Sequence, residues 1–484
     1  MSLAIGREEK GYLYQQVINL IQTMSEQGTL QPGDKLPSLR ILANNLSVSI
    51  PTVKQAYQAL ESQGKIVARE KSGYFLVAKS RNAVQPKKAK LVNKPLQVNK
   101  QGLIEQVYQA IHAPDMIPFG IANPVAVAST DKMLAKLMRK AMQQAGQRAI
   151  NYGAMDGLAA LKKQIVHRYL DMGLLVEQNE MVITNGAQEA LAIALQCVTN
   201  PGDVVAIESP CYFGIVELVE NLGLKAIEIP LCPEEGVWLS DLEQALEKHP
   251  IKACLFSTSI NNPLGSCMPE HKREQLVHLL DRFQVTLIED DVYGELHFGS
   301  ERGLPAMKYA KPERVLTCAS FSKTAAPSYR IGWLIAGPYA EKARRIKRAL
   351  SCSSSLMNQW VLADYLASGE FDRHLKLLRQ RLLTNKNKMR QVLIETFPAD
   401  VLISDPQGGC VFWLDLGKHY DGTRLFHLAL ENGISLTPGS LFSAGQKYQN
   451  CVRLSFGIPW TAEVENAVRT LGTLVRLARK EKAV

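Results

Sequence analysis

The stretch ASFSKTAAPSYRIGW, residues 319–333, contains a lysine, Lys323, that follows Ser320 and Ser322 and precedes Arg330 by seven positions. It overlaps the end of an apolar run, VLTCAS, which has the length and composition of a buried strand. Ligands of α/β proteins gather where strands end and loops begin. A lone lysine in a serine-rich loop is more often a solvated surface charge, so the rest of the chain has to decide between the two interpretations.

Short apolar runs of this kind recur along the chain and alternate with segments of helical periodicity. The predicted strands are MVITNG (181–186), DVVAIES (203–209), KACLFSTS (252–259), VTLIEDD (285–291), VLTCAS (315–320) and WLIAG (333–337). This alternation predicts an α/β domain with a large, mostly parallel sheet.

Polar side chains follow several of these predicted strands. Gly186, Ala187 and Gln188 come after VITN, Tyr212 lies in ESPCY, Asn262 lies in NNPLG, and Asp290 and Tyr293 lie at and just after the end of VTLIEDD. Because the carboxyl ends of parallel strands share one edge of a sheet, we expect these residues to meet near Lys323. Together they are the residue types that a pyridoxal 5′-phosphate (PLP) site requires.

Each residue type has a chemical reason to be there. The Lys323 amine would form an aldimine with the cofactor aldehyde, and Asp290 would keep the ring nitrogen protonated. A phosphate needs hydroxyls, a guanidinium and helix N-terminal amides, which Ser320, Ser322, Arg330 and the turn 186–188 would supply. Asn262 and Tyr293 are the candidate donors to the ring oxygen, and Tyr212 is the candidate platform under the ring.

Two positions in this set remain open. Neighbouring side chains on a strand point to opposite faces, so only one of Asp290 and Asp291 can face the ring. We choose Asp290 because the spacing Asp-x-x-Tyr then ends on Tyr293. Phe213 competes with Tyr212 as the stacking ring.

Residues from about 115 to 475 resemble a fold-type I aminotransferase. The motifs NPLG, EDDVY, SFSK with its downstream arginine, PQGGCVFW and VRLSFG occur in the order and at spacings compatible with that family. The resemblance implies a PLP-binding domain over 115–484, whose smaller C-terminal α+β part covers about 375–484. It also implies that Arg453 binds a substrate α-carboxylate, and that Tyr152 reaches the phosphate in the neighbouring subunit of a homodimer. The alternatives are an exposed strand-end arginine and a tyrosine packed in the core.

The first hundred residues differ in charge from the remainder. They contain 15 Lys and Arg against 6 Asp and Glu, or +9, which leaves 41 against 40, or +1, for the other 384 residues. Such asymmetry suggests a basic nucleic-acid-binding module joined to a nearly neutral body, with a solubilising basic tail as the alternative. Residues 79–114 are interpreted as a basic linker, because the segment 79–102 has little periodicity and two prolines.

Residues 1–78 predict a winged helix. Apolar residues at helical spacing in residues 13–24, the segment PSLRILANNL and the segment SIPTVKQAYQALESQGK predict three helices, with Ser49 as a cap and Gly64 as a stop. The segment IVAREKSGYFLV, residues 66–77, predicts two short strands joined by a turn.

This module resembles the GntR family of winged helix-turn-helix proteins, which implies binding to double-stranded DNA. The third helix would enter the major groove. The candidate DNA-binding residues are Ser49, Thr52, Lys54, Gln55 and Gln58 on that helix and Ser38, Arg40, Arg69 and Lys71 outside it. An arginine is common in the family where this chain has Ile50, and an apolar side chain can touch a thymine methyl but cannot donate a hydrogen bond. For each polar residue the alternative is a solvated helix face.

The whole arrangement resembles the MocR subgroup of transcription regulators. We expect a PLP-dependent regulator whose large domain senses PLP or an amino compound through aldimine chemistry at Lys323. The alternatives are an active aminotransferase with an accessory winged helix, or a large domain that serves only as a dimerisation scaffold.

The sequence also lacks the patterns of a membrane span, a signal peptide, a disulfide framework and a metal site. No apolar run approaches the roughly 18 residues that a membrane span needs. The N-terminus MSLAIGREEK lacks an apolar run of signal-peptide length, so we expect a cytoplasmic protein. The nine cysteines are scattered and never form a CxxC pair, which indicates neither a disulfide framework nor a metal site.

Overall fold

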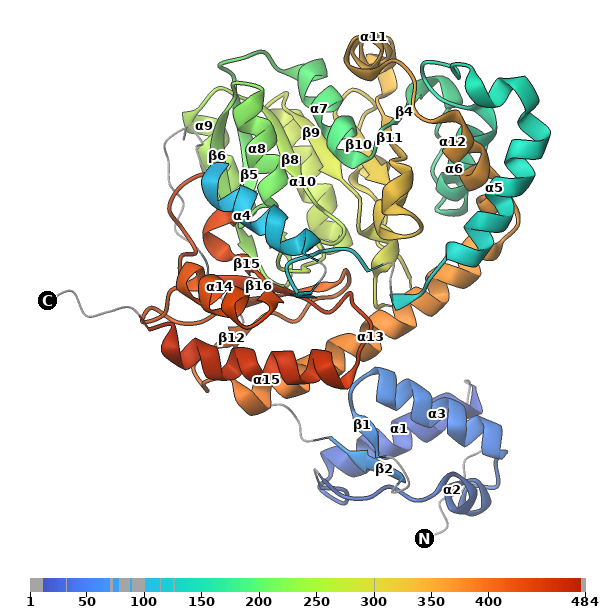
Figure 1. Cartoon of the computed structure of the whole chain (residues 1–484), viewed down its shortest axis with the longest axis vertical. Helices are drawn as coiled ribbons and strands as arrows, with labels where there is room; N and C mark the ends of the chain where they lie inside the picture. Colours follow the sequence, from blue (N-terminus) through green and yellow to red (C-terminus); the bar gives the residue numbers. More distant parts are fainter. Residues whose placement is uncertain are drawn as a thin grey trace, which may run out of the picture. The chain divides into compact units, whose positions relative to one another are not determined.

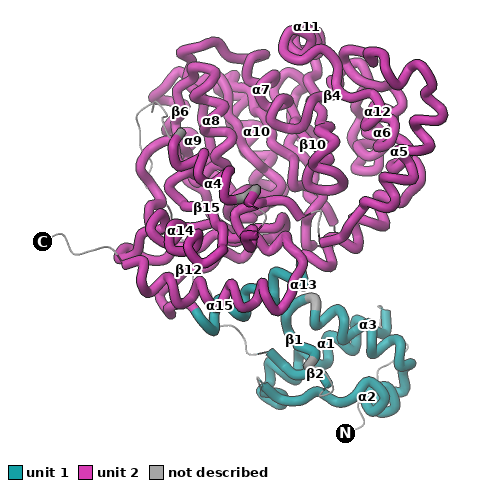
Figure 2. Tube along the Cα trace, in the orientation of Figure 1, with its two compact units in different colours: residues 1–83, 383–396 teal, residues 84–382, 397–484 magenta. Residues whose placement is uncertain are grey.

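The computed structural model describes residues 12–31, 33–69, 73–77, 88, 101–113, 115–124, 127–299 and 301–479. The chain divides into two compact units, residues 1–83 with 383–396 and residues 84–382 with 397–484 (Figure 2). Each unit has its own cluster of buried apolar side chains.

The N-terminal segment has the predicted order of helices and strands. Its elements are α1 (Leu13–Glu26), α2 (Leu39–Asn45), α3 (Ile50–Ser62), β1 (Ile66–Arg69) and β2 (Gly73–Leu76). The two strands pair in antiparallel register, which makes the hairpin of a wing. The predicted turn between them includes residues 70–72, which lie outside the described residues.

The predicted apolar face of α3 forms the centre of this small core. Val53, Ala56, Tyr57 and Leu60 are all fully buried. The Tyr57 hydroxyl donates to the Pro37 carbonyl oxygen at 2.8 Å, and its ring meets Tyr74 edge-on with centroids 4.9 Å apart. A buried aromatic ring with a satisfied hydroxyl fixes α3 against both the preceding loop and the wing.

The large unit is built on the expected sheet, in the strand order β4-β11-β10-β9-β8-β5-β6-β7. The strands are β4 (Met181–Thr184), β5 (Val204–Ser209), β6 (Lys225–Cys232), β7 (Gly236–Val237), β8 (Ile251–Phe256), β9 (Thr286–Asp290), β10 (Val315–Ser320) and β11 (Gly332–Ile335). The pairs among β10, β9, β8, β5 and β6 are parallel, whereas β11 is antiparallel to both of its neighbours. All six predicted strands are present, and β6 and β7 were not predicted.

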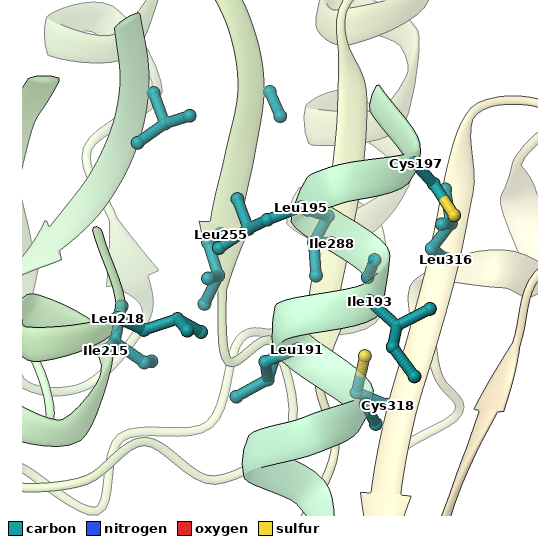
Figure 3. Close-up of a cluster of buried hydrophobic side chains, with 14 of the residues drawn as sticks. Leu191, Ile193, Leu195, Cys197, Ile215, Leu218, Leu255, Ile288, Leu316 and Cys318 are labelled. Atoms are coloured by element: carbon teal, nitrogen blue, oxygen red, sulfur yellow. The ribbon is translucent and has the colours of Figure 1, made fainter. Parts of the chain in front are cut away.

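Helices surround this sheet (Figure 1). They are α5 (Asp131–Ala145), α6 (Ala159–Asp171), α7 (Ala187–Val198), α8 (Phe213–Asn221), α9 (Leu239–Lys248), α10 (Glu270–Arg282), α11 (Ala340–Ser351) and α12 (Leu356–Ala367). The buried residues of α7 meet those of α8, β8, β9 and β10 in one apolar cluster (Figure 3). This packing fixes the N-terminus of α7 at the sheet edge where the polar residues gather.

A second, four-stranded sheet has the order β12-β13-β16-β15. The elements of this C-terminal region are α13 (Glu370–Thr396), β12 (Leu402–Ile403), β13 (Val411–Asp415), α14 (Gly422–Glu431), β14 (Ile434–Ser435), β15 (Thr437–Pro438), β16 (Cys451–Ser455) and α15 (Ala462–Leu477). β14 pairs with β3 (Ile117–Pro118), which ties this region to the start of the large unit.

The predicted linker differs from the structure at its C-terminal end. Helix α4 (Gln101–His112) occupies residues that the prediction of a linker up to 114 left without structure. Its buried face carries Ile104, Val107 and Ala110. Apolar residues at helical spacing were thus present, although the lysines and prolines before them obscured the pattern. Within the described residues, no helix combines the length and hydrophobicity needed to cross a membrane.

Candidate cofactor site and DNA interface

Lys323 lies in a short 3-10 turn, Phe321–Lys323, directly after β10. Burial lowers the pKa of its ammonium group, and the guanidinium groups of Arg453 and Arg330 act in the same direction. Its Nζ lies 5.9 Å from the ring centroid of Tyr293. A lysine whose pKa is lowered by burial has more of the neutral, nucleophilic amine.

The two adjacent aspartates have different surroundings. Asp291 is 5% exposed and forms an ion pair with Arg302, whereas Asp290 interacts with Lys323 and accepts a hydrogen bond from the Val292 amide at 3.1 Å. Burial raises the pKa of Asp290 to about 6, so the carboxylate is largely ionised at neutral pH. This geometry favours Asp290 over Asp291 as the group opposite a protonated ring nitrogen.

We expect Asp290→Asn to weaken PLP binding by about tenfold or more, because hydrogen bonds to charged groups contribute ~1.5–3 kcal/mol. Asp291→Asn is the matched control, since it removes the same charge one residue away but breaks the ion pair with Arg302. It should lower the free energy of unfolding by about 3 kcal/mol with little change in PLP affinity. PLP titration and urea unfolding measure the two effects, and an equal loss of PLP affinity in both variants would contradict the assignment.

The predicted phosphate ligands Ser320, Ser322 and Arg330 lie together after β10. The Ser320 and Ser322 hydroxyls are 2.7 Å apart, and Ser320 also donates to the Ile331 carbonyl oxygen at 3.0 Å. Arg330 is exposed, has a left-handed backbone with φ 54°, and donates from Nη2 to the Asn185 carbonyl oxygen at 3.0 Å. Two hydroxyls and an exposed guanidinium thus border the turn that precedes α7.

That turn provides the backbone amides. Gly186 is the N-cap of α7, with φ 84° and no capping side chain, so the first amides of the helix, including those of Ala187 and Gln188, have no side-chain cap. The Gln188 side chain donates to the Gly214 carbonyl oxygen at 2.6 Å. We therefore expect Gln188 to contribute its backbone amide to an anion, while its side chain holds the turn against α8.

Gly186 has no room for a side chain. A Cβ there would lie 2.5 Å from the Arg330 Nη2 atom, and φ 84° disfavours any residue with a Cβ. We expect Gly186→Ala to lower PLP affinity by about tenfold or more, because it displaces the guanidinium that lies over the turn. PLP titration measures the change.

Gly173→Ala is the matched control for this prediction. Gly173 has a similar φ of 74°, but a Cβ added there would have no neighbour within 4 Å, so the substitution carries the backbone strain without the clash. It should cost about 1 kcal/mol of stability and leave PLP affinity unchanged. Equal PLP affinities of the two variants would refute the proposed contact.

Arg453 is 2% exposed, so the alternative of an exposed strand-end arginine is wrong. It donates to the Asn262 Oδ1 atom at 3.2 Å, to the Gly120 carbonyl oxygen at 2.6 Å and to the Thr437 hydroxyl at 3.1 Å. Its Nε is buried without a hydrogen-bond partner. A fixed, buried guanidinium with a free donor fits a small carboxylate. The Tyr293 hydroxyl donates to the Ala122 carbonyl oxygen at 3.1 Å and would have to turn to reach a ring oxygen.

The two aromatic residues at the start of α8, Tyr212 and Phe213, differ in exposure and packing. Phe213 is 3% exposed and packs edge-on against Phe442 and Tyr108, with centroids 5.7 and 5.8 Å apart. Tyr212 is only partly buried and shares a hydrogen bond with Tyr108. The enclosed Phe213 ring is therefore less available for stacking than that of Tyr212.

Two residues near the site were not predicted. Tyr108 lies on α4, inside the predicted linker, and no motif marked it. Cys410 is fully buried beside Lys323 and Tyr293, and burial raises its thiol pKa to about 11. Its place after the glycines of PQGGCVFW was the available signal.

Tyr152 is 81% exposed, so the alternative that it packs in the core of its own chain is wrong. Ile150, two residues earlier, is 87% exposed. Exposed apolar side chains that form a contiguous patch, rather than single exposed ones, mark surfaces that partners cover.

The predicted DNA-binding residues lie on the N-terminal unit as expected for a helix-turn-helix. Arg40, Lys54, Gln55 and Gln58 are exposed. The Ile50 side chain is 43% exposed, so it is free to meet an apolar group of a partner. On α3, the exposed Lys54, Gln55 and Gln58 alternate with the buried residues at helical spacing, which leaves one face of the helix available to a groove.

Two candidate DNA-binding residues, Ser38 and Ser49, cap helices with their side chains. The Ser38 hydroxyl caps α2 by accepting from the Ile41 amide at 3.3 Å. The Ser49 hydroxyl caps α3 by accepting from the Thr52 amide at 3.2 Å, and it lies 2.8 Å from the Thr52 hydroxyl. Arg69 closes β1, and Lys71 lies outside the described residues.

Comparison with known proteins finds a family match for each of the two parts of the chain. The model of the aminotransferase class I and II family matches residues 114–471, and that of the gntR family of bacterial regulatory proteins matches residues 13–76. The uncharacterized HTH-type transcriptional regulator YdcR of Escherichia coli (strain K12) is 38% identical over 96% of this chain and 99% of its own length. YjiR, named likewise from the same strain, is 33% identical over 96% of this chain and 98% of its own.

Among solved structures, LysN, an alpha-aminoadipate aminotransferase from Thermus thermophilus complexed with N-(5′-phosphopyridoxyl)-L-leucine, is similar with a TM-score of 0.72. It is 25% identical and covers 78% of this chain and 95% of its own. Lys323 and Asp290 fit PLP, which is the cofactor that this domain indicates. So does the phosphate cradle, by which we mean Ser320, Ser322, Arg330 and the turn 186–188. The chain belongs to the aminotransferase class I and II family and joins that domain to a GntR helix-turn-helix, as regulators of the MocR type do.

Proposed function

We propose that this regulator senses PLP, or an amino compound that reacts with PLP, through its aminotransferase-like unit and changes its binding to double-stranded DNA in response. The observation that carries the proposal is the group of candidate cofactor-binding residues around Lys323, in the same chain as a helix-turn-helix. A scaffold that served only for dimerisation would have no use for a lysine of lowered pKa at this position.

Bound PLP supplies an aldehyde that combines reversibly with amines. The chain's own residues determine which amines can reach it. Lys323 holds the cofactor, Asp290 keeps a proton at the ring nitrogen, and Arg453 orients a carboxylate through its unpaired Nε. We therefore propose an effector that carries an amino group and a carboxylate, as α-amino acids do.

We further propose that two chains form a homodimer through the surface around Tyr152. Exposed apolar side chains gather in this part of the sequence and on α11: Met142 is 54%, Ile150 87%, Tyr152 81%, Met155 39% and Leu350 53% exposed. A dimer that buried them would offer Tyr152 to the partner's phosphate site. It would also present two winged helices to DNA, which suits a site made of two halves. Its DNA partner implies action in the cytoplasm.

The second candidate function is transamination. It is favoured by the lowered pKa of Lys323 and by the buried, partly unpaired Arg453, both of which an enzyme would also use. A regulator needs the amine to bind, but it does not need rapid turnover.

One experiment separates the two functions. The full chain is incubated with randomised double-stranded DNA, with and without PLP, and the retained fragments are sequenced. Parallel samples receive amino donors and keto acids. The proposal predicts enrichment of one sequence, retention that changes with PLP, and slow or no turnover. Rapid turnover without enrichment of any sequence would identify an enzyme instead.

A further inference from the structure

A buried ion pair supports the turn that precedes α7. Lys347 of α11 is fully buried, and its Nζ lies 3.1 Å from the Glu189 Oε2 atom in the first turn of α7. Ser351 joins the pair, because its hydroxyl donates to the Glu189 Oε1 atom at 2.5 Å and accepts a hydrogen bond from Lys347. Both oxygens of this carboxylate therefore have partners on α11.

Glu189 also holds the backbone of the turn. The Asn185 amide donates to its Oε2 atom at 2.5 Å, and the Asn185 side-chain amide donates to Oε1 at 3.3 Å. On its other side, the Asn185 carbonyl oxygen accepts from Arg330 at 3.0 Å. A continuous chain of contacts thus connects Lys347, through Glu189 and Asn185, to the guanidinium of the phosphate cradle.

The negative charge of Glu189 would repel the cofactor phosphate if Lys347 did not neutralise it. A carboxylate in the first turn of α7 lies close to the turn 186–188, where the dianionic phosphate of PLP is expected. Like charges in a partly buried place repel each other more strongly than in water. With Lys347 fully buried against it, the carboxylate can hold the turn without opposing the phosphate.

We propose that Lys347 is a positioning residue for the cofactor phosphate, which it favours by neutralising Glu189. This inference rests on the proposed PLP binding and concerns only the phosphate end of the site. Lys347 does not touch the cofactor in this proposal. Replacing Lys347 should therefore lower PLP affinity only when both the cofactor phosphate and the Glu189 carboxylate are present. A general loss of stability would not produce this dependence.

The test compares PLP with pyridoxal, which has the same aldehyde and ring but no phosphate. Both are titrated into the full chain and followed by visible absorbance. Lys347→Met should raise the Kd for PLP by about tenfold or more and change that for pyridoxal by less than about twofold. The double variant Lys347→Met with Glu189→Gln should return the Kd for PLP to within about threefold of the unsubstituted chain, because no unpaired carboxylate remains.

Lys162→Met is the matched control. Lys162 is 4% exposed and pairs with Asp156 at 2.5 Å, so this variant loses a similarly buried partner without touching the turn. Its PLP affinity should be unchanged. Thermal unfolding shows which variants are folded. If Lys347→Met alone does not fold, the charge-neutral double variant decides the question, since it should still bind PLP within about threefold.

An unchanged PLP affinity of Lys347→Met, an equal loss for PLP and pyridoxal, or a double variant no better than the single one would overturn the proposal. Failure of the proposed PLP binding itself would be distinguishable from these outcomes, because the unsubstituted chain would then take up no PLP.

Discussion

After borohydride reduction and denaturation, the Lys323→Ala variant is expected to retain no PLP, whereas the unsubstituted chain retains it covalently. The Nζ of Lys323 lies at the end of β10, close to Asp290 and 5.9 Å from the Tyr293 ring centroid, and burial lowers its pKa. An amine whose pKa is lowered by burial is the group that can join the cofactor aldehyde. Peptide mapping of the reduced protein should therefore find the cofactor on the Lys323 peptide and on no peptide of the alanine variant.

Lys308→Ala is the control for adventitious labelling. Lys308 is a partly exposed lysine that pairs with Glu270 at 3.3 Å, away from the cradle. This variant should retain as much cofactor as the unsubstituted chain. If Lys323→Ala retains the cofactor on another lysine at full occupancy, the site has been assigned to the wrong residue.

Reversing one charge on the recognition helix is expected to have a comparably large effect on DNA. Lys54 is exposed on α3, next to the exposed Gln55. Lys54→Glu should raise the Kd for the selected sequence by roughly 5- to 150-fold, because single contacts of this kind contribute ~1–3 kcal/mol. The dependence of binding on salt should also become weaker, since fewer counterions are released. Titrations at several salt concentrations measure both changes.

Lys418→Glu makes the same change in net charge at an exposed position of the large unit. Its DNA affinity should stay close to that of the unsubstituted chain. Equal losses in the two variants would mean that net charge, rather than α3, governs DNA binding.

The sequence predicts much of the fold because the strong patterns are local. The apolar faces of α1 and α3 appear at helical spacing, and the central strands appear as apolar runs bounded by polar loops. β6 was missed although it is buried, because Pro230 interrupts its sequence KAIEIPLC and a proline inside an apolar run is atypical of a central strand. Its fully buried acid, Glu228, accepts from the Ala444 amide at 2.6 Å, a partner far along the chain that only the structure shows.

Site residues that stand in a motif could be proposed from the sequence. Interactions between residues that lie far apart along the chain could not. Lys323, Asp290 and Arg330 stand in recognisable motifs. The choice between Asp290 and Asp291 depended on spacing, whereas the ion pair of Asp291 with Arg302 became visible only in the structure. The pair of Glu189 with Lys347 joins α7 to α11, and no local pattern relates two such distant helices.

The most direct test of the central claim, that occupancy at Lys323 controls DNA binding, is the equilibrium affinity of the full chain for its selected DNA sequence at fixed salt, with and without PLP. We predict that saturating PLP changes this Kd by at least about fivefold, the lower end of ordinary coupling between sites. Identical affinities, measured while peptide mapping shows Lys323 fully occupied by the cofactor, would contradict the claim.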